Sequence, residues 1–345
     1  AASDVYKRQA QEWAGVECDP DEIRLVGAVR DKANPYYVSW LAGGDAFAES
    51  VGLEQTQLAY DNDSQVLQSQ VRTLLAVGEG PCTVLNILPH SDTDTPVLVD
   101  AANEAGAWLI TQWNKPADLR PTDETPTWLS HLTYNDEDFG YQIAKALFED
   151  MGGEGDIVAI SGTLGATAGS ARDAGLDRAL EEYPGITLLD RQTAEFKRDL
   201  ATTVMNTLVA KHGDDIEGVW VANDDMAVGA LNALKAAGMD GTVKVVGVDA
   251  IPEAIGGVQD GTFAATALAD AYWQGGIGLA IGYCVLTGEI DPAAITDEQR
   301  NWFAGSAIIT ADNVDQYAGE PDAAKYVAED WTCDSLWDNF VAPIP

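Results

Sequence analysis

The 345-residue chain has little positive charge, because 19 lysines and arginines stand against 56 aspartates and glutamates, a formal net charge of −37. Most of such a molecule would repel a phosphate backbone or an anionic lipid surface, so nucleic acid is not an expected partner. Hydrophobic residues nevertheless make up 46% of the chain, more than a disordered acidic chain carries. The charge therefore lies on the surface of a folded protein.

Long apolar runs are also missing. A membrane-spanning helix needs about 20 consecutive apolar residues, and the longest candidate, residues 275–285, is interrupted by glycines. We therefore expect no membrane span. Residues 1–19 are expected to be a terminal extension, and the stretch SDVYKRQ within it resembles a translated sequencing adapter. The lack of a signal peptide is therefore uninformative about export.

The four cysteines are far apart and form no C-x-x-C pair, which argues against a zinc ribbon or a thioredoxin-type site. Cys82 and Cys284 lie in apolar segments, where we expect buried free thiols. Cys18 and Cys333 lie in polar terminal segments. A disulfide between these two is an open alternative in an oxidising compartment.

Histidine is scarce as well, with only His90, His131 and His212 in the chain. None is part of a G-x-S-x-G or H-E-x-x-H motif, and the chain has no phosphate-binding G-x-x-x-x-G-K-[ST] loop. The glycines at 162 and 165 follow a predicted strand but lack the spacing of a dinucleotide fingerprint. We therefore expect a protein without catalytic residues, metal or cofactor.

Short apolar runs alternate with amphipathic stretches, which is the β-α-β pattern of a parallel sheet covered by helices on both faces. The first half predicts strands at 23–29, 56–60, 83–88 and 108–112 and helices at 40–51, 64–77 and 96–105. Residues 115–126 are rich in proline and charge and predict a surface loop. The second half predicts strands at 156–161, 187–192, 218–222, 243–249, 263–268 and near 307–310 and helices at 141–151, 168–182, 198–212, 226–237 and 275–287. The length also suits two domains of about 150 residues, so we expect an α/β protein of two doubly wound lobes.

Polar and aromatic residues follow most of the predicted strands, at the end of the sheet where open α/β folds bind ligands. Aromatic faces can stack on the C–H face of a sugar, while amides, a guanidinium and a carboxylate pair with its hydroxyls. We therefore expect a neutral monosaccharide or sugar alcohol as ligand. Each asparagine or aspartate taken alone is equally well explained as a turn or helix-capping residue. The candidate ligand-binding residues are Asn34, Tyr36, Tyr37, Asn62, Trp113, Asn114, Arg172, Phe196, Asn223 and Asp249.

Several stretches of the chain resemble the type I periplasmic solute-binding proteins of ABC transporters, in particular the ribose, xylose and polyol group. They are NPYY at 34–37, SARDAGL at 170–176, VWVANDDMAVGALNAL at 219–234, VKVVGVDAIPEAI at 243–255, and DGTFAAT with YWQGG between 260 and 276. The resemblance covers most of the chain. It is specific for the superfamily and much less so for the ligand.

The resemblance implies that Asn34, Tyr36 and Tyr37 line one lobe of the site and that Arg172, Phe196, Asn223 and Asp249 line the other, with Asn62 as a further amide contact. The ribose-binding pattern has aspartate and arginine where this chain has Trp113 and Asn114, and glutamine where it has Ala269 followed by Asp270. Asp270 is therefore a candidate in place of that glutamine. These departures favour another pentose, a hexose or a polyol over ribose.

The resemblance also implies discontinuous lobes, the first made of about 20–131 and 270–303 and the second of 132–269 and 304–345. Three crossovers near His131, Ala269 and Ala304 would form the hinge, and closure would bury the ligand. The implied partners are the membrane subunits of an ABC transporter, and the implied location is the periplasm or the outer cell surface. A ligand-sensing module of a chemotaxis or sensor-kinase system would have the same pocket and is the alternative. A repressor is not expected, because the residues before Ile23 are too few for a helix-turn-helix.

Overall fold

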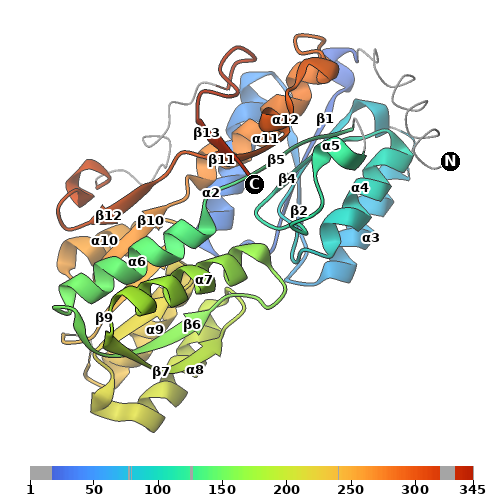
Figure 1. The fold of residues 1–345 in the computed structure, drawn as a ribbon. Coiled ribbons are helices and arrows are strands. Elements are labelled where there is room, and N and C mark those ends of the chain that lie inside the picture. Colours follow the sequence, from blue (N-terminus) through green and yellow to red (C-terminus); the bar gives the residue numbers. More distant parts are fainter. Residues whose placement is uncertain are drawn as a thin grey trace.

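The computed structural model describes residues 18–76, 78, 80–124, 127–239, 241–318 and 331–344, and these form two α/β lobes (Figure 1). Each lobe is built on one sheet with helices on both of its faces, as the sequence predicts. Most of the predicted extension at residues 1–19 lies outside the described residues.

The first lobe is built on a seven-stranded sheet with the order β13-β11-β5-β4-β3-β1-β2. Its strands are parallel except for the edge strand β13, which runs antiparallel to β11. The strands are β1 (Arg24–Val29), β2 (Gln55–Ala59), β3 (Thr83–Ile87), β4 (Trp108–Gln112), β5 (Trp128–Thr133), β11 (Asn301–Ala304) and β13 (Phe340–Pro343). The helices are α2 (Pro35–Ser50), α3 (Ser64–Leu75), α4 (Asp94–Ala105), α5 (Pro121–Glu124), α11 (Ala271–Leu286) and α12 (Asp297–Arg300), with 3-10 turns at Pro20–Glu22, Gly80–Cys82 and Pro292–Ala294.

The second lobe is built on a six-stranded sheet with the order β12-β10-β9-β8-β6-β7. Only β12 is antiparallel to its neighbour. The strands are β6 (Glu154–Ser161), β7 (Gly185–Thr193), β8 (Gly218–Val221), β9 (Lys244–Val248), β10 (Phe263–Leu268) and β12 (Ala307–Thr310). The helices are α6 (Asp136–Asp150), α7 (Thr167–Glu182), α8 (Arg198–His212), α9 (Asp224–Ala236) and α10 (Pro252–Asp260), with 3-10 turns at Gly213–Asp215 and Val314–Gln316.

Three helices begin four or five residues earlier than their apolar pattern predicts. Helix α2 begins at Pro35 because Asn34 caps the amide of Tyr36, and α6 begins at Asp136 because Asn135 caps the amide of Asp138. Helix α11 begins at Ala271, where Asp270 accepts from the amide of Trp273. Polar and aromatic residues in a first turn obscure the apolar period, and the first turn of α2 carries the candidate site residues Tyr36 and Tyr37.

Strand β5 is not among the predicted strands, because Ser130 and His131 interrupt its apolar run. Both side chains are buried, and each is satisfied by a hydrogen bond. Ser130 donates to the carbonyl of Gln299 at 2.9 Å, and His131 Nδ1 lies 2.9 Å from Thr111 Oγ1. Hydrogen-bonded polar side chains can thus lie in a central strand, and such a strand is not predicted from a pattern of apolar residues.

The chain passes between the lobes after β5, after β10 and after β11, near the three predicted crossovers. The prediction is wrong for the last part of 304–345. Beyond β12 the chain returns to the first lobe, where β13 pairs with β11 at the edge of the first sheet. This pairing requires a long-range match between two short strands, which the local pattern does not reveal.

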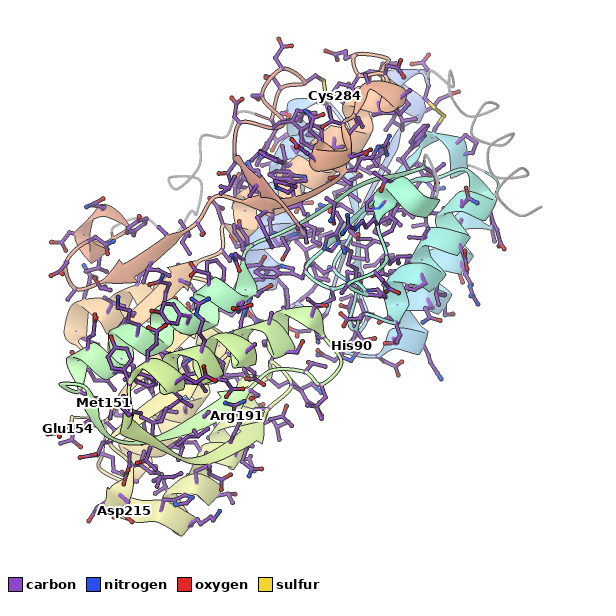
Figure 2. All side chains as sticks on the ribbon, viewed as in Figure 1. His90, Met151, Glu154, Arg191, Asp215 and Cys284 are labelled. Atoms are coloured by element: carbon purple, nitrogen blue, oxygen red, sulfur yellow. A yellow bond between two sulfur atoms is a disulfide. The ribbon has the colours of Figure 1, made fainter. Side chains whose placement is uncertain are left out.

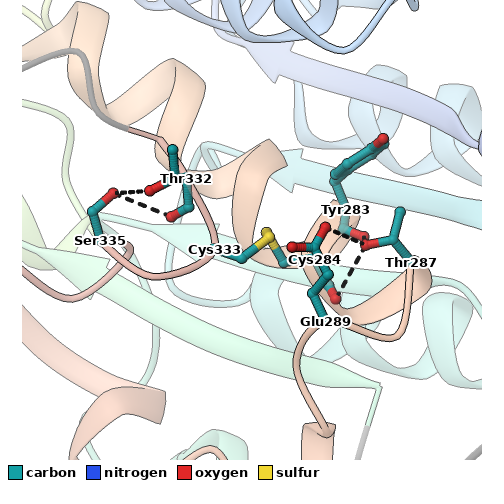
Figure 3. The surroundings of a disulfide bond; sticks show 7 residues. All are labelled: Tyr283, Cys284, Thr287, Glu289, Thr332, Cys333 and Ser335. Atoms are coloured by element: carbon teal, nitrogen blue, oxygen red, sulfur yellow. Dashed lines mark hydrogen bonds between the residues drawn. A yellow bond between two sulfur atoms is a disulfide. The ribbon is translucent and has the colours of Figure 1, made fainter.

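The cysteine predictions are wrong, because all four cysteines are in disulfides, Cys18 with Cys82 and Cys284 with Cys333. The amide of Cys18 donates to the carbonyl of Leu286, so the start of the described chain runs beside the end of α11. Figure 3 shows Cys284 of α11 joined to the segment that leads into β13. Both disulfides lie within the first lobe, and neither joins the lobes.

Helices α2 and α11 pack closely inside the first lobe. A Cβ atom on Gly275 would collide with the carbonyl of Trp40, so the close approach of the two helices requires glycine there. Helix α11 is buried along almost its whole length. Within the described residues, no helix combines the length and the apolar composition needed to cross a membrane.

Candidate functional site

A small cavity lies between the lobes, at the carboxyl ends of the strands of both sheets. The first lobe contributes seven lining residues and the second lobe five: Arg30, Tyr36, Tyr37, Leu88, Pro89, Trp113 and Asn114, and Ala168, Arg172, Phe196, Asn223 and Asp249. The structure therefore brings eight of the eleven candidate residues to one place, and the lobes are in contact around them.

Asn34, Asn62 and Asp270 do not line this cavity. The side chain of Asn34 caps α2, and that of Asp270 caps α11. The side-chain oxygen of Asn62 accepts from Arg30 at 3.4 Å. Each of the three has a structural role next to the site, which is the alternative that the sequence leaves open for strand-end asparagines and aspartates.

The aromatic wall of the first lobe comes from the first turn of α2 and the end of β4. The rings of Tyr36 and Tyr37 meet edge to face with centroids 5.6 Å apart, and the indole of Trp113 packs on Tyr36 at 6.0 Å. Trp113 Nε1 donates to Tyr36 Oη at 2.9 Å, and that hydroxyl in turn donates to Gln274. The Tyr36 hydroxyl is thus committed to the protein, and its ring is left for a ligand to pack against.

The hydroxyl of Tyr37 is different. Within the described residues the Tyr37 hydroxyl forms no hydrogen bond. Burial raises the pKa of Tyr37 well above its usual value, so the hydroxyl stays protonated. A protonated hydroxyl beside the cavity can both donate to and accept from a ligand hydroxyl. Of the two tyrosine hydroxyls at the site, the Tyr37 hydroxyl is therefore the one that can bind a ligand.

Arg30 is a lining residue that the sequence reasoning missed. It directly follows β1 and is almost fully buried, and it donates to the carbonyl of His90 at 2.6 Å and to Thr163 Oγ1 of the other lobe at 3.0 Å. Figure 2 labels its neighbour His90 where the two lobes meet. Arg30 is the first polar residue after an apolar strand, so the strand-end rule applied one residue earlier would have found it.

Arg172 of α7 is held by the second lobe. Its Nε donates to Asp136 at 2.8 Å in a buried ion pair, and a terminal nitrogen donates to the carbonyl of Ala222 at 2.8 Å. Burial raises the pKa of Asp136 to about 6, while the Arg172 charge opposes that shift. The guanidinium is thereby fixed in direction, with its remaining N–H groups left for the cavity.

Asn223 and Asp249 form the carboxylate corner of the site. Asn223 Oδ1 caps α9 by accepting from the amide of Met226, and its Nδ2 donates to Asp249 Oδ2 at 3.2 Å. Burial raises the pKa of Asp249 well above its usual value, the Arg172 charge opposes this, and the nearby carboxylate of Asp224 adds to it. Within the described residues Asp249 Oδ1 has no protein donor, so it can accept from a ligand.

Three lining residues have left-handed backbones that side chains rarely adopt. Their φ angles are 68° at Trp113, 59° at Phe196 and 125° at Asp249. Such conformations persist only where the surroundings determine them, and they cluster at functional sites. At Asp249 the support comes from Asp224, which accepts from the amide of Ile251 at 3.1 Å and from Thr266 at 2.8 Å.

Each lobe also stacks an arginine on an aromatic ring of the other lobe. The Arg172 guanidinium lies 4.9 Å from the ring centre of Trp113, and that of Arg30 lies 5.4 Å from the ring centre of Phe196. Contacts of this kind are worth about 0.5 to 2 kcal/mol, more when shielded from water. They form only when the lobes meet, so the structure shows a closed arrangement.

Comparison with known proteins agrees with this geometry. Residues 27–290 match the periplasmic binding protein domain family. The chain is 29% identical over 305 residues to a xylitol-binding protein of Mycolicibacterium smegmatis, covering 88% of this chain and 81% of that protein. It is 31% identical over 247 residues to the ribose import binding protein RbsB of Escherichia coli, covering 71% and 78%.

A solved structure extends the similarity to the whole fold. The crystal structure of a twin-arginine translocation pathway signal protein from Burkholderia phytofirmans is 35% identical, with a TM-score of 0.88, covering 93% of this chain and 98% of that one. The chain belongs to the periplasmic binding protein family. Members of this family bind solutes in the periplasm and do not convert them, so this protein is a solute-binding protein and not an enzyme.

Proposed function

We propose that this protein captures a neutral monosaccharide or sugar alcohol between its lobes and delivers it to the membrane subunits of an ABC transporter. The carrying observation is the lining of the cavity, where Tyr36, Tyr37 and Trp113 face Asn223 and Asp249 across the closed lobes. Aromatic faces beside a carboxylate and an amide suit a ligand that has C–H faces and many hydroxyls. The relatives named for xylitol and ribose support this ligand class.

The charges at the cavity support a neutral ligand. Arg172 pairs with Asp136, and Arg30 and Asp249 line the cavity with groups of opposite charge. A charged ligand would leave one unit of charge uncompensated in a closed site, which costs free energy. Hydroxyls satisfy both signs, because they donate to the carboxylate and accept from the guanidinium groups.

Trp113 and Asn114 support a ligand other than ribose. Where the ribose-binding pattern has aspartate and arginine, this chain has an indole whose N–H is bonded to Tyr36. The Asn114 amide donates to the carbonyl of Pro89 at 2.9 Å and accepts from the amide of Ala168 at 3.2 Å. Two charged ligand-binding side chains are thus replaced by the indole face of Trp113 and by the amide of Asn114, whose hydrogen bonds are made to the protein. Such a wall fits a ligand with a larger C–H face or a different arrangement of hydroxyls.

Thermal denaturation with a panel of sugars is expected to identify the ligand. The panel is xylitol, ribose, xylose, arabinose, allose, glucose, galactose and myo-inositol, with acetate and lysine as charged controls. A ligand at 100 times its Kd adds about 2.7 kcal/mol to the free energy of unfolding, because it binds only the folded protein. The melting temperature should rise with one or more neutral members. A rise with the charged controls alone, or turnover of a panel sugar, would contradict the proposal.

A further inference from the structure

Helix α7, which carries Arg172, begins without a capping side chain of its own. Its N-cap residue is Ala166, which has no side-chain oxygen. The first amides of a helix have no partner within the helix and need an acceptor from elsewhere. Serine, threonine, aspartate or asparagine usually supplies that acceptor from the N-cap position.

The acceptors come from the opposite lobe. Asp92, which lies between β3 and α4, accepts with Oδ1 from the amide of Thr167 at 2.8 Å and from its hydroxyl at 2.7 Å. Asn114, which follows β4, accepts with Oδ1 from the amide of Ala168 at 3.2 Å. Two side chains of the first lobe thus cap a helix of the second lobe.

Backbone groups extend the same contact. The amide of Asp92 donates to the carbonyl of Gly165 at 3.0 Å, and the Thr167 hydroxyl oxygen also lies 2.9 Å from the carbonyl oxygen of Lys115. Asp92 and Thr167 are not among the residues that line the ligand cavity. The contact between Asp92 and Thr167 is therefore part of the lobe interface and outside the ligand cavity, whereas the neighbouring pair Asn114 and Ala168 lines the cavity.

We infer that Asp92 is a latch that stabilises the closed form by capping α7 from the other lobe, and that it thereby sets the ligand affinity without touching the ligand. In the open form the lobes separate and the cap is lost, so only closure gives the first amides of α7 these side-chain acceptors in place of water. The same contact fixes the end of the helix from which Arg172 reaches the site. The inference rests on the proposed function, since ligand binding is what the latch strengthens.

A latch of this kind changes the affinity for every ligand by the same factor. The apparent affinity of a ligand that needs the closed form depends on how readily that form is reached. A residue that contacts the ligand acts differently, because its loss matters more for ligands that use it. The ratio of affinities across the panel therefore distinguishes the two roles.

The test is calorimetric titration of Asp92→Ala with the panel sugars that bind the wild type. Loss of a helix cap corresponds to about fivefold weaker binding, within a range of roughly two- to thirtyfold. All ligands should weaken by that factor, with their order unchanged. Asp92→Asn should bind nearly as the wild type, because the side-chain oxygen of asparagine can still accept from the amide and the hydroxyl of Thr167.

Asp63→Ala is the matched control. Asp63 caps α3 within the first lobe by accepting from the amides of Gln65 and Val66 at 2.7 and 3.2 Å. Its loss should lower the free energy of unfolding and leave ligand affinity unchanged. Equal affinities of Asp92→Ala and wild type, or a changed order of ligands in Asp92→Ala, would overturn the inference.

Hydrogen exchange in the ligand-free protein provides a measurement that needs no ligand. The amides of Thr167 and Ala168 should exchange faster in Asp92→Ala than in the wild type, and Asp63→Ala should not change them. If no panel sugar binds the wild type, the proposed function fails and this exchange measurement alone decides on the latch. Unchanged exchange in Asp92→Ala would then refute it.

Discussion

Asp249→Ala is expected to weaken ligand binding at least about tenfold without unfolding the protein. Removing this carboxylate leaves ligand hydroxyls and the Asn223 amide unpaired in a closed site, a loss of about 1.5 to 3 kcal/mol. Titration against the panel ligand with the largest thermal shift measures the change. Asp177→Ala is the control, because Asp177 pairs with Arg191 on the surface of the same lobe. Unaltered affinity in Asp249→Ala would remove Asp249 from the site.

The same carboxylate should make the affinity depend on pH. Burial and the neighbouring Asp224 raise the pKa of Asp249, and burial raises that of Asp224 to about 7. Ligand hydroxyls that donate to Asp249 favour its ionised form. Binding should therefore be strongest above the raised pKa and should weaken as the pH falls through it. Titrations between pH 5 and pH 8 measure this, and Asp249→Asn should show a smaller dependence than the wild type. A wild-type affinity that increases toward pH 5 would contradict the assignment.

Loss of either disulfide is expected to lower the free energy of unfolding by about 4 kcal/mol. The bridges join residues that are 64 and 49 positions apart, and closing loops of this length in the unfolded chain removes that much conformational entropy. The double variants Cys18→Ser/Cys82→Ser and Cys284→Ser/Cys333→Ser, unfolded in urea, measure each bridge separately.

Ligand affinity is the control for the disulfide variants. Both bridges lie in the first lobe and none of the four cysteines lines the ligand cavity, so the folded double variants should bind as the wild type does. An unchanged free energy of unfolding in either variant would contradict the expected stabilisation. A loss of affinity in a folded variant would show that the bridge also shapes the site.

The roles of the candidate residues show how far strand-end reasoning reaches. Parallel strands end at the same edge of their sheet, so Tyr36, Arg172, Asn223 and Asp249 could be predicted to meet from their places after apolar runs. Whether a strand-end side chain faces the ligand or caps a helix depends on its direction. Asn34 is the example, since it lies beside two lining tyrosines but caps α2.

The sequence by itself determined the two α/β lobes, most of their strands and helices, and the residues at the strand ends. These features follow from periodicity and from capping over a few neighbouring residues, which act before the chain has folded. Only the tertiary structure decided which cysteines pair, where β13 adds to a sheet, and how Arg30 and Asp92 reach the other lobe. The physical reason is that these contacts join residues far apart in the chain, and their distances depend on how all the intervening elements pack.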